Sequence, residues 1–350
     1  MYKVIFATLI TLSISAYSGD NNSPLRPKNS VIQGVNYIGT SVSNLEQSVD
    51  FYTNAVQLQL SDEKEFIDEP LLNQLANRSN THVKTKLLKS SNAQIRFMQF
   101  SSPSVAANNT KYVEINGPGF AHVCYQAQSK TQAYQKFIKA GALPIGDPDM
   151  IQLSAKNPVH YAYARDLDNT PIEIEHVDVE KLDRKTPPKH QYRIRHIALA
   201  TPDFDRTIAF YSTLLEQENP RVLGSFFPLS GEKFNGMSGL EDTKLKMAFF
   251  HIRNMELEIA QYLNHPTTAP ETPRPVDALG YNMLVFDVTD LALAKKKLIA
   301  AGGSIETEAR SMDGGQIFFG RDLDNNLLGF QKLDINSPYS AKNFADDGSS

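Results

Sequence analysis

The chain has 350 residues, of which 41% are hydrophobic and 21% charged, the composition of a globular protein that is long enough for two domains of ordinary size. A formal net charge of −4, a pI near 6.1 and the lack of any Lys/Arg run exclude an extended basic surface, and with it nucleic acid as a partner. Cys124 is the only cysteine. An intrachain disulfide is therefore excluded, and the core alone must hold the protein together.

The first residues predict an export signal. Lys3 supplies a positive charge, and Val4–Ile14 is mostly apolar but too short to span a bilayer. Small residues follow, so cleavage is expected after Ala16 or Ser18. A signal peptide is therefore predicted over 1–18, and the mature protein is expected to be periplasmic or secreted, with no membrane attachment. The alternative is an apolar N-terminus of a cytosolic protein.

Four times along the chain, a short apolar strand precedes a helix that begins with a capping residue. "NYIGTSV" leads into Ser43 and Glu46, which have the form of a capping box, and "HIALA" leads into Thr201 and Pro202. After each helix we expect three strands, as in "HYAYARD", a turn and "PIEIEHV". The other two helices are expected to begin at Ser129 and at Thr289–Asp290. The four units of strand, helix and three strands are 33–100, 119–178, 193–262 and 280–334.

The first two units are repeated by the last two. "VSNLEQSVDFY" matches "TPDFDRTIAFY", "GFAHVCYQ" matches "GYNMLVFD", and the turn "RDLDN" occurs at 165–169 and at 321–325, so the copies lie about 160 residues apart. The chain is therefore predicted to contain two homologous domains, 33–178 and 193–334. The polar segment after them, 335–350, is predicted to be a disordered tail.

These motifs, together with "RDLDNTPIEIE" and the layout of four units, resemble the glyoxalase or vicinal-oxygen-chelate superfamily over nearly the whole mature chain. The resemblance implies an α+β fold in which four βαβββ units pair into two cupped mixed sheets. It also implies a metal site to which each paired unit contributes one ligand from its first strand and one, usually Glu, from its last.

The ligand positions of the family hold suitable residues only in the two middle units. They fall on His122 and Glu173 in the second unit and on His196 and Glu258 in the third. Imidazole nitrogen and carboxylate oxygen suit one divalent metal ion, such as Zn, Ni, Fe, Co or Mn. The positions of the first and fourth units hold Tyr37, Arg96, Met283 and Gly329. These residues cannot make a comparable site, because the arginine repels a cation and the glycine has no side chain.

How the units pair decides whether a complete site exists. If the first pairs with the second and the third with the fourth, each pair holds only one His and one Glu. If the second pairs with the third and the first with the fourth, one complete set of two His and two Glu forms, as in four-unit members of the family. We expect this nested pairing, because all the intact ligands lie in adjacent middle units.

Two further side chains are expected beside the site. Because strand residues two apart share a face, Cys124 lies on the face of His122 and Glu175 on the face of Glu173. Cys124 is expected to be a small buried residue. For Glu175 two interpretations stay open, a proton shuttle and a carboxylate at the end of a strand.

The resemblance implies a metal-dependent lyase or isomerase as the leading hypothesis. The metal would bind neighbouring oxygens of a small molecule and stabilise an enediolate, while Glu173 or Glu258 moves the proton. Glyoxalase I is the chemical analogue, although an exported enzyme would meet little glutathione and so implies another substrate. We expect a small-molecule substrate as the partner, and a monomer or homodimer as the assembly.

Two other functions are compatible with the resemblance. An extradiol-type dioxygenase uses two His and one Glu around Fe(II), but that family places its site in the second half, where Met283 and Gly329 stand. The other is a non-enzymatic binding protein that holds a small molecule in the cup without a metal.

Overall fold

A computed structural model describes residues 30–182, 190–334 and 336–344. The signal peptide predicted over 1–18 lies outside these residues. Within the described part of the chain, no helix is long and apolar enough to cross a membrane.

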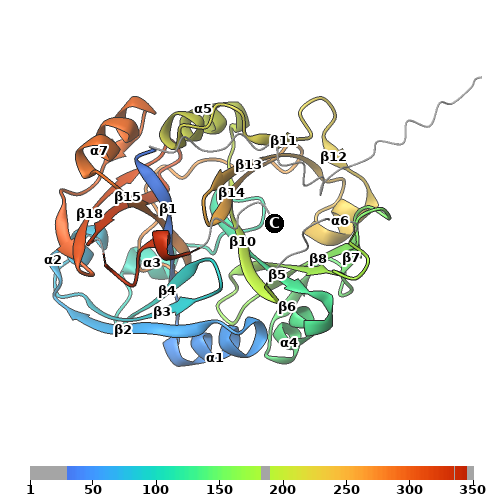
Figure 1. The fold of residues 1–350 in the computed structure, drawn as a ribbon, viewed down its shortest axis with the longest axis horizontal. Helices are drawn as coiled ribbons and strands as arrows, with labels where there is room; N and C mark the ends of the chain where they lie inside the picture. The colour runs from blue at the N-terminus through green and yellow to red at the C-terminus, as the bar shows by residue number, and fades with distance from the viewer. Residues whose placement is uncertain (1–29, 183–189, 335, 345–350) are drawn as a thin grey trace, which may run out of the picture.

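The described strands form two cupped mixed sheets that lie side by side (Figure 1). The nine-stranded sheet has the order β16-β18-β19-β15-β1-β4-β3-β2, with β17 paired to β18. Its strands come from the first and fourth units. They are β1 (Ile32–Ser41), β2 (Gln59–Ile67), β3 (His82–Lys89), β4 (Gln94–Phe100), β15 (Gly280–Val288), β16 (Ser304–Ile305), β17 (Arg310–Met312), β18 (Gly315–Arg321) and β19 (Leu327–Leu333).

The ten-stranded sheet is built from the second and third units. Its order is β11-β13-β14-β10-β5-β9-β8-β6, with β12 paired to β13 and β7 to β8. Its strands are β5 (Gly119–Gln128), β6 (Leu143–Ile145), β7 (Ile151–Gln152), β8 (Val159–Arg165), β9 (Pro171–Val177), β10 (Tyr192–Ala200), β11 (Arg221–Leu223), β12 (Leu229–Ser230), β13 (Lys244–Ile252) and β14 (Met255–Tyr262).

The first strands of paired units meet at the centre of each sheet. β5 and β10 run antiparallel in one sheet, and β1 and β15 do so in the other. Each first strand also lies parallel to the last strand of its own unit, for example β5 beside β9 and β10 beside β14. The predicted α+β fold and its nested pairing of units are therefore confirmed, and each sheet takes one unit from each half of the sequence.

Four of the described helices cover the outer faces of the two sheets, and the largest cluster of buried apolar residues contains side chains from both sheets and from these four helices, which are the first, fourth, fifth and seventh in the chain (Figure 1). Smaller apolar clusters lie on the other side of each sheet. The helices are α1 (Leu45–Val56), α2 (Pro70–Leu75), α3 (Val105–Asn109), α4 (Ala133–Lys139), α5 (Phe204–Leu215), α6 (Glu232–Ser238) and α7 (Leu291–Ala300), with 3₁₀ turns at Ser129–Thr131 and Ala341–Asn343.

The N-caps of α1 and α5 lie one or two residues later than the sequence predicted. Asn44 rather than Ser43 accepts the amide hydrogen bond at the start of α1, and Asp203 rather than Thr201 does so for α5. The predicted residues have another partner. The hydroxyl of Ser43 donates to Asp168, and that of Thr201 donates to Asp324 at 2.8 Å. For α7, Asp290 is the cap, as predicted.

These contacts explain why the turn at Arg165 occurs again at Arg321. In the first copy, Asp166 accepts a 2.6 Å hydrogen bond from the hydroxyl of Tyr52 on α1, and in the second, Asp322 accepts one of 2.8 Å from Tyr211 on α5. The turn leaves one sheet and binds the helix that covers the other, so it links the two sheets. The repeated "FY" and "RDLDN" motifs are thus the two sides of one structural contact.

This contact gives a first testable result. Tyr52→Phe should lower the free energy of unfolding by about 1–3 kcal/mol, because it removes a donor from the buried carboxylate of Asp166 while keeping the ring. Urea unfolding measures the loss. Tyr211→Phe is the matched variant and should cost a similar amount. An unchanged midpoint for both variants would show that the link between the sheets is not energetically significant.

The predicted disorder of 335–350 is wrong for 336–344. Ala341 and Phe344 are buried in this segment, and the hydroxyl of Ser340 donates to the buried carboxylate of Asp287 on β15. The segment packs against β1, where Gly34 leaves room for the Ala341 side chain. The segment is mostly polar, so its sequence did not indicate that a few of its residues pack against the nine-stranded sheet.

Candidate metal centre

The four predicted ligands meet at the centre of the ten-stranded sheet. His122 on β5 and His196 on β10 stand on the two antiparallel central strands. Glu173 comes from β9, the neighbour of β5, and Glu258 from β14, the neighbour of β10. One donor atom from each of the four lies within 4.8 Å of all the others, and all four residues are buried. The structure thus brings together every predicted ligand, while their binding of a metal stays a prediction.

The distances between donor atoms are those of a coordination shell. Nε2 of His196 lies 2.9 Å from Oε2 of Glu173, 3.2 Å from Oε2 of Glu258 and 3.4 Å from Nε2 of His122. Nε2 of His122 lies 3.2 Å from Oε2 of Glu173. A metal that bonds its ligands at about 2.1 Å holds neighbouring donors roughly 3 to 3.4 Å apart. The donor set and its spacing therefore fit one divalent cation.

An aromatic ring packs against each of the two imidazoles. The ring of Tyr163 packs edge-on against His122 at 4.9 Å, and that of Phe249 packs against His196 at 6.0 Å. Nδ1 of each imidazole is buried without a hydrogen-bond partner in the described structure. The polar atoms of the two rings therefore meet other polar groups only where the four side chains converge, through Nε2.

The two carboxylates have different surroundings. Burial alone would raise the pKa of Glu173, but hydrogen bonds with His122 and His196 outweigh it and hold that pKa well below its usual value. Burial raises the pKa of Glu258, and the charge of Glu173 raises it further. Two buried carboxylates this close repel each other unless a cation or proton lies between them.

In the nine-stranded sheet, the positions equivalent to the four candidate ligands do not form a set of metal ligands. One of them, Arg96, instead makes a buried ion pair. Arg96 is 2% exposed, lies 4.4 Å above the ring of Tyr37 and donates to Asp313 at 2.6 Å. Asp313 also accepts from Lys64 at 2.6 Å. A side chain at Gly329 would collide with neighbouring apolar groups. The protein's own guanidinium thus provides the positive charge here.

Glu175 is a buried partner of an arginine, which was not foreseen from the sequence. It is fully buried, pairs with Arg195 and accepts from the amide of Gln126 at 2.6 Å. Arg195 also approaches Glu256, which lies two residues before Glu258 on β14. Charged residues alternate with apolar ones in "PIEIEHV", "YRIRHIALA" and "MELEIAQY", and this pattern is the signal that could have suggested ion pairs between these strands. Cys124 is buried as expected, and burial raises the pKa of its thiol well above the usual value.

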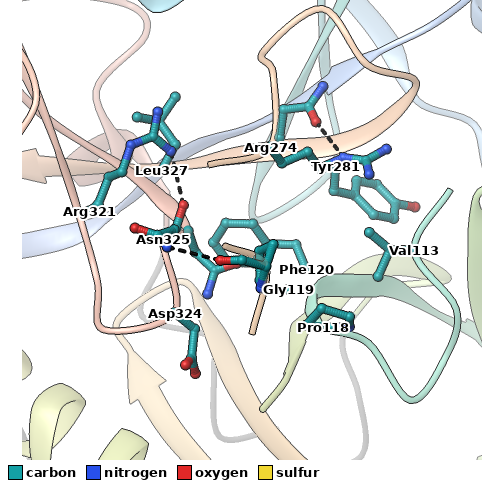
Figure 2. Close-up of a pocket in the computed structure, with 13 residues that line it drawn as sticks. Val113, Pro118, Gly119, Phe120, Arg274, Tyr281, Arg321, Asp324, Asn325 and Leu327 are labelled. Carbon is teal, nitrogen blue, oxygen red and sulfur yellow. Dashed lines mark hydrogen bonds between the residues drawn. The ribbon is translucent and has the colours of Figure 1, made fainter. Parts of the chain in front are cut away.

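A separate hollow lies beside the turn at Arg321, and Figure 2 shows the side chains that line it. None of the four clustered His and Glu residues lines this hollow. Arg274 donates to the side chain of Asn282 at 3.2 Å, and Arg321 to the carbonyl of Asn325 at 2.9 Å. These guanidinium groups hold loops together.

Comparison with known proteins agrees with this fold. A family model described as the Glyoxalase/Bleomycin resistance protein/Dioxygenase superfamily matches residues 34–153 and 193–330. Glyoxalase I from Zea mays has a similar structure, with a TM-score of 0.59 at 15% identity over 85% of this chain and 92% of that one. A putative dioxygenase from Bacillus subtilis gives 0.55 at 12% identity over 92% and 91%. Comparison with curated proteins finds no match.

Proposed function

The chain belongs to the Glyoxalase/Bleomycin resistance protein/Dioxygenase superfamily, and we propose that it is a metal-dependent lyase or isomerase of the glyoxalase-like kind. The observation that carries this proposal is the convergence of two imidazole nitrogens and two carboxylate oxygens at one buried point. The substrate would be a small molecule with two neighbouring oxygens. A periplasmic or secreted location, as the predicted signal peptide implies, is part of the proposal and favours a substrate other than a glutathione adduct.

The two carboxylates of the centre can have different roles in the reaction. When bound, a divalent metal acts as a Lewis acid toward the two oxygens and stabilises the negative charge that develops there. Glu173 contacts both imidazoles, so it is held in place as a ligand. Within the described residues, Glu258 is paired with one imidazole, that of His196, so it is the freer carboxylate. We assign Glu258 the transfer of a proton from one substrate carbon to its neighbour.

The donor set favours this reaction over ring cleavage. A site with two His and one carboxylate leaves coordination positions open for both an organic substrate and oxygen. Here Glu258 adds a second carboxylate to the cluster, which leaves one position fewer and balances the charge of a divalent ion. Both observations suit a reaction in which the metal does not change its oxidation state.

Metal analysis and turnover under argon test the proposal. We expect one tightly bound divalent ion per chain and conversion of 2-oxoaldehydes without oxygen. Glu258→Gln should keep the metal but lower turnover by about 10²–10⁴-fold, because an amide cannot accept the proton. Cleavage of catechols that requires oxygen would assign the protein to the dioxygenases. A metal-free protein that binds small molecules without turnover would instead be a binding protein.

A further inference from the structure

The candidate metal centre is closed to solvent in this structure. The exposed fractions of the four residues are 2%, 4%, 2% and 3%, for His122, Glu173, His196 and Glu258. A substrate with two oxygens cannot reach donors that are this deeply buried unless some element moves. The sheet itself is an unsuitable candidate, because its central strands are paired on both edges.

Among the described helices, α6 lies across the open side of the ten-stranded sheet (Figure 1). It belongs to the third unit, but it lies against β7 and β8 of the second unit as well as β12 of its own (Figure 1). Its side chains Phe234 and Met237 are buried in the apolar cluster that also contains Tyr163 and Tyr262. Because the ring of Tyr163 contacts His122, this cluster borders the metal centre. We call it the cup cluster.

Glycine residues flank α6 on both sides, as expected for a helix that can move as a unit. Gly231 before the helix and Gly239 after it both have positive φ, and a Cβ at Gly231 would meet nothing within 4 Å. Among the described residues, few hydrogen bonds join α6 to the second unit. The amide of Asp147 donates to the carbonyl of Gly236 at 2.7 Å, and Lys233 donates to the carbonyl of Gln152. To uncover the centre, α6 would have to break these polar contacts and withdraw Phe234 and Met237 from the apolar cluster.

The corresponding helix of the nine-stranded sheet provides an internal comparison. In the first unit, α2 occupies the same place in the order of elements, and it packs Leu71, Leu72 and Leu75 against an apolar cluster. Neither α2 nor the residues beside it contain glycine. That sheet has no ligand set to reach. Glycine joints therefore occur in the helix that covers the candidate centre and are missing from the helix that covers only a core.

We propose that α6 is a movable cover of the metal centre, and that Phe234 and Met237 contact the part of the substrate that does not bind the metal. The substrates it fits are compounds with two neighbouring oxygens and an apolar group, because the cup cluster consists of apolar and aromatic side chains. The inference rests on the proposed function for its substrate, but the motion of α6 can be measured without it.

A reversible cross-link tests the motion. A Cβ on Gly236 would lie 3.1 Å from Cγ of Asp147, and in a disulfide the Cβ of one cysteine lies about 3 Å from the sulfur of the other. Asp147→Cys with Gly236→Cys should thus form a bond that fastens α6. Oxidation should slow release of bound zinc to a chelator at least about tenfold and stop turnover, and reduction should restore both. Each single variant is the control. An oxidised protein with unchanged zinc release would overturn the proposal.

Hydrogen exchange separates this inference from the proposed function. In metal-free protein, the amides of α6 should exchange at least about tenfold faster than those of α2. Equal protection of both helices would contradict a movable cover even if the protein binds metal. Fast amide exchange of α6 in a protein that does not bind metal would support a movable helix. It would also contradict the proposed metal-dependent enzyme.

The apolar contact has its own test. The protein should prefer a phenyl-substituted 2-oxoaldehyde to the methyl-substituted one, and Phe234→Ala should reduce that preference in kcat/KM about tenfold. A variant with the same preference as the parent protein would show that α6 does not contact this part of the substrate.

Discussion

His122→Ala and His196→Ala should each lower the affinity for a divalent metal by at least about 100-fold. Each substitution removes one of two imidazole donors, whose Nε2 atoms lie 3.4 Å apart. The three remaining donors would hold a metal in an incomplete shell, and ligand loss of this kind weakens binding strongly. Metal content after gel filtration, together with a competition titration against a chelator, gives the affinity.

Matched controls are available in the other sheet. Tyr37→Phe and Met283→Leu change the equivalent positions on β1 and β15, and both should leave metal affinity unchanged. If only one of the two histidine variants loses the metal, the two imidazoles do not share an ion and the proposed centre is wrong. If Tyr37→Phe also loses it, the metal lies elsewhere.

Arg96→Ala should destabilise the protein by about 3–5 kcal/mol, because it leaves the buried carboxylate of Asp313 without its main partner. The side chains of this pair are 3% and 2% exposed. The guanidinium and the nearby charge of Lys64 keep the pKa of Asp313 below its usual value despite burial, which alone would raise it. Chemical unfolding of the variant, monitored by far-ultraviolet circular dichroism, measures the loss.

A double-mutant cycle distinguishes the ion pair from the loss of side-chain packing. Asp313→Ala alone should also be destabilising, and the double variant should cost clearly less than the sum of the two single variants. Metal affinity should stay the same throughout, since the pair belongs to the other sheet. A loss below about 1 kcal/mol for Arg96→Ala would show that water replaces the guanidinium at little cost.

The sequence alone was enough to predict the first helix of each unit with the strand before it, the repeat and the four candidate ligands, but it did not reveal the short helices α2, α3 and α6. Strand and helix patterns depend on local periodicity, which can be read over ten residues. The surviving ligands could be found because the repeat supplies a comparison within the chain, in which Glu173 corresponds to Gly329. The adjacency of the intact ligands even favoured the nested pairing that β5 and β10 now show.

The roles of the other polar residues depend on contacts that form only in the folded protein. Asp313 pairs with Arg96 although the two lie 217 residues apart, and Glu175 pairs with an arginine from another unit. Such partners depend on the register between strands of different units, which no local pattern encodes. The N-caps of α1 and α5 were predicted wrongly for the same reason, since Ser43 and Thr201 form hydrogen bonds with turns far along the chain. The position of α6 likewise depends on where Gly236 meets the loop at Asp147, a contact that exists only once the second and third units have paired in the ten-stranded sheet.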